Sequence, residues 1–117
     1  MKKHIIKQQV ILFFITAFGL ASTTIADSHT QQLLEMGKQL SLACQSCHGF
    51  GNNGKNATPY VPKITGQHKE YTIAQLKAYR NGTRKGGMAA HMKIAASIFE
   101  EEQYEAIALY LESLRED

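Results

Sequence analysis

Two cysteines and a histidine fall within five consecutive positions, Cys44, Cys47 and His48. The chain of 117 residues contains no other cysteine. A disulfide between residues three apart would close a very short loop, and the stabilisation from loop closure shrinks with loop length. The pair is therefore a poor crosslink, and we interpret the two thiols as attachment points.

In a helix, residues three and four apart share a face. Cys44 and Cys47 would then point the same way, with His48 one turn after Cys44. Two thiols in this arrangement can bond to the vinyl groups along one edge of a haem while the imidazole reaches the iron. C-x-x-C-H is the attachment motif of c-type haem. The segment thus predicts one covalent haem c, held by both cysteines, with His48 as an axial iron ligand.

Three other interpretations of the motif stay open. A thioredoxin-like redox pair also uses C-x-x-C, but it sits near a strand, and this sequence has no strand pattern. A zinc site needs about four ligands, and the remaining candidates, His68 and His91, are isolated. A plain structural disulfide is the third.

The first 26 residues have the order of a secretory signal peptide. Lys2, Lys3 and Lys7 give a basic start, an apolar run covers residues 10–21, and Thr24 and Ala26 have the small side chains of a cleavage site. A membrane span needs about 20 apolar residues, more than this run supplies. We expect cleavage after Ala26, a single domain over residues 27–117, no permanent membrane span, and export to the periplasm of a bacterium.

The charges are segregated along the sequence. The formal net charge is +3, but loss of the basic start would leave 10 basic and 10 acidic residues, which argues against a basic protein that coats nucleic acid. Residues 100–117 contain seven acidic residues and one basic residue, Arg115. The basic set, between residues 55 and 93, either steers an acidic partner or simply solvates the surface; it consists of Lys55, Lys63, Lys69, Lys77, Arg80, Arg84, Lys85 and Lys93.

Helical patterns dominate the chain. Capping boxes at residues 28–31 and 97–100 predict the starts of a first and a last helix. A middle helix is predicted over Lys69–Arg80, because Asn81 and Gly82 supply a stop. Residues 50–66 are a predicted loop. The apolar stripes are Leu33, Leu34, Met36, Leu40 and Ala43 in the first helix, and Ile107, Tyr110, Leu111 and Leu114 in the last. A 91-residue domain has a marginal core, so a bound cofactor would stabilise it.

With these residues in view, the chain resembles the class I cytochromes c, and within them a small bacterial periplasmic branch that includes two-haem proteins. The resemblance covers residues 33–114 and is carried by MGKQLSLACQSCHG, VPKITGQHKEYTIAQLKAYRNGTR and IALYLESL. It implies a small all-α fold whose N- and C-terminal helices cross, with the haem held between helices and loops. A single C-x-x-C-H implies one haem.

The resemblance also implies roles for individual residues. Gly37 matches the glycine at the helix crossing, and Tyr110 the aromatic residue packed against it. Pro62 matches the proline whose carbonyl accepts a hydrogen bond from the haem histidine, a role for which Pro59 is the less favoured bearer. Relatives place a methionine ligand of the iron shortly before the last helix.

The distal ligand has three candidates in this sequence. Met92, six residues before Ile98, fits the family interval best, and Met88 is the alternative. Matching Ile94 and Ala95 to the relatives instead sets His91 opposite their methionine.

The function implied is electron transfer between redox proteins, without catalysis. With both axial positions filled, the iron would cycle between ferric and ferrous states. One alternative is a haem c subunit docked in a larger dehydrogenase. Another is a haem enzyme or sensor with an open axial position, in which His91 would serve.

Overall fold

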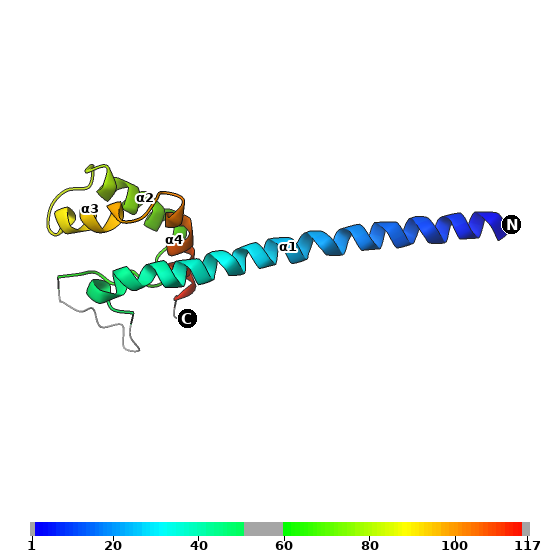
Figure 1. The fold of residues 1–117 in the computed structure, drawn as a ribbon, viewed down its shortest axis with the longest axis horizontal. Helices are drawn as coiled ribbons and strands as arrows, with labels where there is room; N and C mark the ends of the chain where they lie inside the picture. The colour runs from blue at the N-terminus through cyan, green and yellow to red at the C-terminus, as the bar shows by residue number, and fades with distance from the viewer. Residues whose placement is uncertain (1, 51–59, 116–117) are drawn as a thin grey trace. The chain divides into compact units, whose positions relative to one another are not determined.

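The computed structural model describes the backbone of residues 2–50 and 60–115, and side chains from Ile25 onward. Within these ranges the only regular elements are four helices: α1 (Lys2–His48), α2 (Lys69–Arg80), α3 (Ala89–Ser97) and α4 (Gln103–Ser113) (Figure 1). The predicted all-α class is confirmed. Of the residues described, no helix has both the length and the hydropathy that a membrane crossing requires.

The chain divides into two units at residues 32 and 33. The first, Met1–Gln32, is helical from Lys2 and belongs to α1. The second, Leu33–Asp117, contains the end of α1 and the three shorter helices, and all the residues of the predicted site lie in it.

The predicted helix start at residue 28 is wrong, because α1 runs through this position. The Ser28 hydroxyl donates to the Ile25 carbonyl at 3.0 Å, and the Thr30 hydroxyl donates to the Ala26 carbonyl at 3.1 Å. Hydroxyl side chains inside a helix satisfy themselves in this way on the preceding turn. They therefore do not cap free N–H groups here.

The core of the second unit is built around α4. Tyr104, Ile107 and Leu111 are buried along one side of this helix, and Phe99 joins them from the preceding turn. The predicted stripe is right for Ile107 and Leu111 but missed Tyr104, the largest fully buried side chain. Partly buried apolar side chains pack against this cluster from α1, the loops and α2: Leu40, Phe50, Ile64, Ile73 and Leu76.

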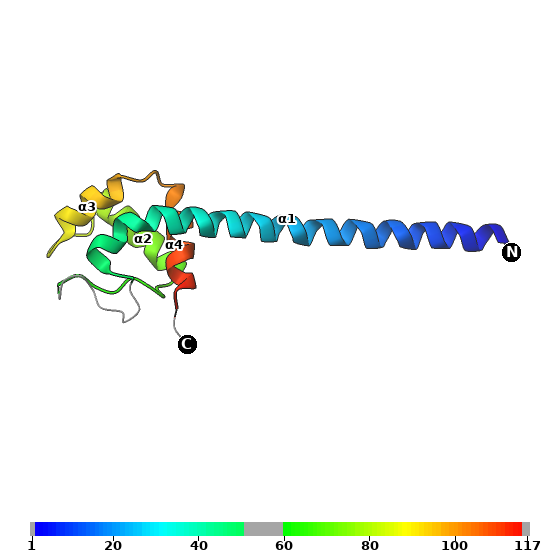
Figure 2. The ribbon, with the colours of Figure 1, turned by 60° about the horizontal axis from the view of Figure 1, so that its bottom comes forward.

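Helices α1 and α4 cross at Gly37 (Figure 2). A Cβ atom at this position would overlap the carbonyl group of Ala106 and lie 2.8 Å from Cβ of Tyr110. Only a residue without a side chain lets the two backbones come this close. The predicted crossing, with Tyr110 against Gly37, is confirmed.

Helix α2 has the predicted bounds, and Gly82 follows it with a φ of 72°. The capping box predicted at residues 97–100 is wrong. Ser97 ends α3 and donates to the Lys93 carbonyl at 2.7 Å. The backbone N–H of Glu100 instead donates to the side chain of Gln103 at 2.9 Å, three residues further along. The last helix consequently begins at Gln103.

The segregated charges of the sequence meet in space. Three side-chain nitrogens of α2 lie close to carboxylate oxygens: Lys69 Nζ is 3.4 Å from Glu105, Lys77 Nζ is 3.2 Å from Glu101, and Arg80 Nη2 is 3.9 Å from Glu100. These surface pairs contribute about 0–1 kcal/mol each to stability. Their larger consequence is that carboxylates near the start of α4 neutralise three members of the basic set.

Candidate functional site

The two cysteines lie on the last two turns of α1. Cys44 is half-buried, Cys47 is exposed, and both thiols are free. The helix ends directly afterwards because Gly49 adopts a φ of 58° and its N–H donates to the Gln45 carbonyl at 2.8 Å. Both thiols therefore belong to a helix C-terminus, unlike a thioredoxin-like pair, which lies between a strand and a helix.

A continuous line of α1 residues faces the interior before the cysteines. Gly37 and Ser41 are buried, and Cys44 and His48 follow at helical spacing. The stripe predicted for this helix was partly wrong, since Met36 is 46% exposed and Ala43 is also exposed. The small residues Gly37 and Ser41 carry no strong apolar signal, which is why the pattern misplaced the inward face.

Burial and one short hydrogen bond hold the His48 ring. The residue is 6% exposed, and its Nδ1 atom donates to the Pro62 carbonyl at 2.7 Å. A proton on Nδ1 leaves the lone pair of the neutral ring on Nε2, the atom that is then free to bind a metal. A backbone partner of this kind orients a ligand histidine and raises its basicity. The pairing anticipated between His48 and Pro62 is thus present.

The loop that carries Pro62 is fastened to the end of α4. The Gly66 N–H donates to the Leu111 carbonyl at 2.7 Å, and the Arg115 guanidinium donates to the Gly66 carbonyl at 3.3 Å. Glu112 accepts a hydrogen bond at 3.1 Å from the backbone N–H of Lys69, the first residue of α2. Sequence reasoning missed Glu112, because a helix cap supplied 43 residues away leaves no local pattern.

The Cys44 thiol is neutral at neutral pH before any attachment. Burial, and secondarily the neighbouring Cys47, raises its pKa to about 11. A thiol so protected is a weak nucleophile, since the thiolate is the reactive form. Cys44 is therefore ill suited to spontaneous redox exchange.

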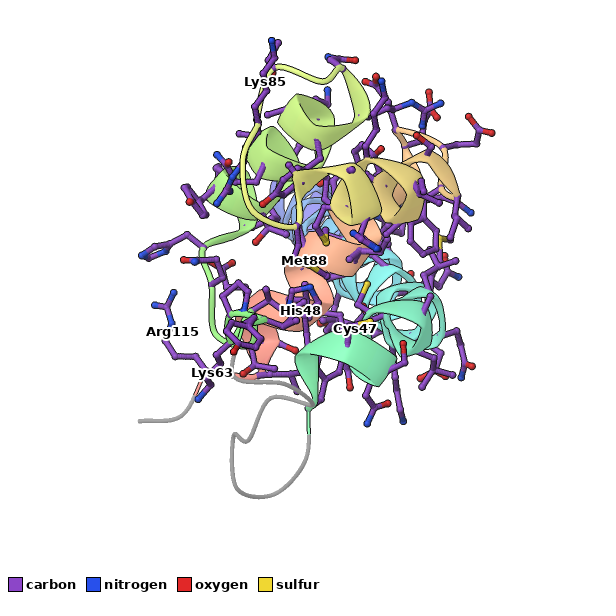
Figure 3. All side chains as sticks on the ribbon, turned by 90° about the vertical axis from the view of Figure 1, so that its left-hand side faces the viewer. Cys47, His48, Lys63, Lys85, Met88 and Arg115 are labelled. Carbon is purple, nitrogen blue, oxygen red and sulfur yellow. The ribbon has the colours of Figure 1, made fainter. Side chains whose placement is uncertain are left out.

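Helix α3 (Ala89–Ser97) and the residue before it contain the three candidates for the distal ligand. Met88 precedes its first residue and is 48% exposed, Met92 is half-buried, and His91 is exposed. The N–H of Met92 donates to the Met88 carbonyl at 3.1 Å, so the two methionines are one turn apart on the same side of the helix. In Figure 3, Met88 lies beside His48 and Cys47, on the face turned to the viewer.

Known proteins match the part of the chain that forms this arrangement. The family described as Cytochrome c matches residues 34–115. The chain belongs to the cytochrome c family. Cytochrome c-554(548) of Halomonas halodenitrificans is 41% identical over 70 residues, which cover 60% of this chain and 82% of that protein.

Longer proteins match over the same part. Cytochrome c4 of Thiocapsa roseopersicina is 28% identical over 62% of this chain and 38% of its own length. The protein of Stutzerimonas stutzeri named thiosulfate dehydrogenase electron acceptor is 36% identical over 57% of this chain and 30% of its own. The match to these two spans only about a third of their length.

The residues present fit the cofactor of the family, a covalent c-type haem. Two free thiols lie one turn apart at the end of α1, and the adjacent His48 ring uses Nδ1 for the hydrogen bond to Pro62, which leaves Nε2 as its nitrogen for a metal. Met88 and Met92 would offer thioether sulfurs as a further iron ligand. In the part of the chain that the structure describes, no group of three or more His, Cys, Asp or Glu could hold a metal ion by itself. The donor set is that of haem c, with electron transfer as its chemistry.

Proposed function

We propose that residues 27–117 form a periplasmic carrier with one haem, exported by a signal peptide at residues 1–26 that is then removed. The His48–Pro62 hydrogen bond carries this proposal, because it fixes one axial ligand in a single tautomer and orientation. Cys44 and Cys47 would hold the haem covalently. Haem c supplies an iron that changes between ferric and ferrous states.

The protein's own part is to keep the site rigid and closed. The glycine crossing of α1 and α4 positions the end of α1, and the loop fastened to α4 positions Pro62. Fixed ligands on both sides would leave no open position for substrate, which favours electron transfer over catalysis. A site whose geometry changes little between the ferric and ferrous states has a low reorganisation energy, which suits an electron carrier.

We propose Met92 as the distal ligand. Ile94 is 70% exposed whereas Ala96 is fully buried, so the inward-facing pair on α3 is Ala95 and Ala96. If Ala95 and Ala96 are aligned with the relatives in place of Ile94 and Ala95, the alignment shifts by one residue. Met92 then stands opposite their methionine, and His91 does not.

Replacement of each methionine tests the assignment. Met92→Ala should erase the weak far-red sulfur-to-iron band of the ferric protein and allow added imidazole to bind readily, whereas Met88→Ala should preserve the band. Loss of the band in Met88→Ala alone would transfer the role to Met88. Its absence from the wild-type protein would favour His91, since two imidazoles give no such band and lower the reduction potential.

Expression with a haem c maturation system tests the main proposal. The purified protein should keep its haem through acid–acetone extraction and be reduced by ascorbate without consuming any substrate. Cys44→Ala and Cys47→Ala should each lose covalent haem, and the chain without haem should be largely unfolded, because so small a core depends on its cofactor. Equal melting temperatures with and without haem would contradict this account.

A second candidate function is a haem subunit bound permanently to a dehydrogenase. The name of the Stutzerimonas stutzeri relative, which pairs an electron acceptor with thiosulfate dehydrogenase, supports testing it. Gel filtration of a native periplasmic extract distinguishes the two. The free carrier elutes at the size of a small domain, and the subunit co-elutes with a large enzyme.

A further inference from the structure

Some basic side chains of the second unit pair with carboxylates, and others do not. Lys69, Lys77 and Arg80 pair with carboxylates near the start of α4. Within the described ranges, no carboxylate pairs with Lys38 of α1 or with three exposed basic side chains between α2 and α3: Arg84, Lys85 and Lys93.

These three cations line one hollow between the end of α2 and the start of α3. Its volume is about 290 Å³, and no acidic residue contributes to its wall. The other lining residues are small or aromatic, among them Tyr79, Gly82 and Ala89. A hollow of this size, lined by cations without acidic neighbours, has room for the carboxylate of an acidic side chain.

One of the cations, Arg84, is held in place before any partner arrives. The Arg84 guanidinium lies 4.8 Å from the centroid of the Tyr79 ring and donates to the Gln75 side chain at 2.6 Å. Lys93 reaches over the turn at Gly82, where a Cβ atom would stand 3.6 Å from its Nζ atom. Cations already ordered lose less conformational entropy when they bind an anion.

The hollow adjoins the methionine-bearing start of α3. Lys85 precedes Met88 by three residues, and in Figure 3 Met88 lies between His48 and Lys85. Arg115 lies to the left of His48 in that view, away from Lys85. Its guanidinium is bonded to the Gly66 carbonyl and lies 3.9 Å from Glu112, so its charge is already balanced.

We propose that this hollow receives a carboxylate of an acidic redox partner protein and so places that partner beside the distal side of the haem. The proposal rests on the proposed carrier function and narrows the docking surface from the basic set to Arg84, Lys85 and Lys93. Charge complementarity of this type chiefly sets orientation and association rate.

The probe is a peptide of six glutamates. It is titrated into the ¹⁵N-labelled ferrous holoprotein at low salt, and binding is followed by NMR through the chemical shifts of the backbone amides. The largest amide shifts should fall on Gly82, Gly86 and Ala89. Lys85→Ala and Lys93→Ala should each weaken binding about threefold, and the double variant about tenfold. Lys38→Ala, which removes an exposed lysine of α1 outside the hollow, should change affinity less than twofold, about the limit for an uninvolved surface charge.

Three outcomes would overturn the proposal: shifts centred on Arg115, equal effects of Lys38→Ala and Lys85→Ala, or displacement of the peptide by an equal concentration of inorganic phosphate. The last would identify a site for small anions. The visible spectrum and the reduction by ascorbate are recorded while the same sample is converted to the ferrous state. Failure of the carrier function would appear there as missing or irreducible haem, whereas failure of the docking site alone leaves both intact.

Discussion

The histidine side and the methionine side of the site are held in different ways. His48 is 6% exposed, and its partner loop is bonded to α4. Met92, the proposed distal ligand, is half-buried and lies on α3, a helix with no side-chain cap. One buried link of α3 to the core is the Tyr104 hydroxyl, which donates to the Ala96 carbonyl at 2.8 Å.

This difference indicates that His48 is held in place by its own contacts, whereas the position of the methionine ligand depends on the packing of α3. The histidine side is fixed by backbone geometry and one hydrogen bond. The methionine side depends on how firmly the nine-residue helix α3 packs against α2, and on the single hydrogen bond from Tyr104 of α4. We therefore expect perturbations of α3 to loosen the distal ligand while leaving His48 in place, and the following substitutions test that asymmetry.

The largest effect is expected at the helix crossing, which supports the histidine side. Gly37→Ala puts a Cβ atom into the carbonyl of Ala106, so the helices must separate. Overpacking of this kind costs about 3 kcal/mol, more than the helix propensity that alanine adds. Thermal unfolding of the ferric holoprotein should show a melting temperature lower by about 15 °C. The exposed neighbour substitution Lys38→Ala is the control, and equal melting of the two variants would contradict a tight crossing.

A smaller effect is expected from the link between α4 and α3. Tyr104→Phe leaves the ring in the core but removes the donor to Ala96, which should cost about 1.5 kcal/mol. Imidazole should bind the ferric protein more readily, because α3 is less firmly held. Tyr71→Phe, at a 47% exposed position on α2, is the matched control. If imidazole affinity is the same in both variants, the methionine side is not anchored through Tyr104.

The smallest effect concerns the cap that Glu112 supplies to α2. Glu112→Ala removes the acceptor of the Lys69 N–H and should lower the free energy of unfolding by about 1 kcal/mol, as loss of a helix cap does. Glu112→Gln keeps an acceptor and should cost about half as much. Urea unfolding measures both, and Glu105→Ala, which removes the exposed carboxylate paired with the Lys69 side chain, is the control for loss of surface charge. A larger loss in the control would assign the effect to surface charge.

Local chemistry explains which features could be predicted. The haem motif, the bounds of α2 and the glycine crossing each depend on a few adjacent residues or on a matched glycine. Both capping boxes failed because the same hydroxyl that caps a helix start can bond backwards inside a helix. Ser28 and Ser97 do so, and only the surrounding chain decides between the two uses.

Long-range partners lay beyond the sequence pattern. The burial of Tyr104 and the capping of α2 by Glu112 arise from contacts between separate elements, and neither has a periodic signature. The choice among Met92, Met88 and His91 was open because alignment was uncertain by one residue. The buried Ala96 favours Met92 by fixing which residues of α3 face inward.

The pairing of basic α2 residues with the carboxylates near α4 also governs how residues 27–117 would behave at a distance. With formal charges that cancel, these residues exert almost no net attraction on a charged body several Debye lengths away, where a Debye length is about 10 Å at 0.1 M salt. What persists is a dipole, created by leaving Arg84, Lys85 and Lys93 unbalanced in one place. The field of an acidic partner rotates a dipole more strongly than it attracts it. Such a molecule would therefore be oriented toward an acidic partner only during the last nanometre of approach.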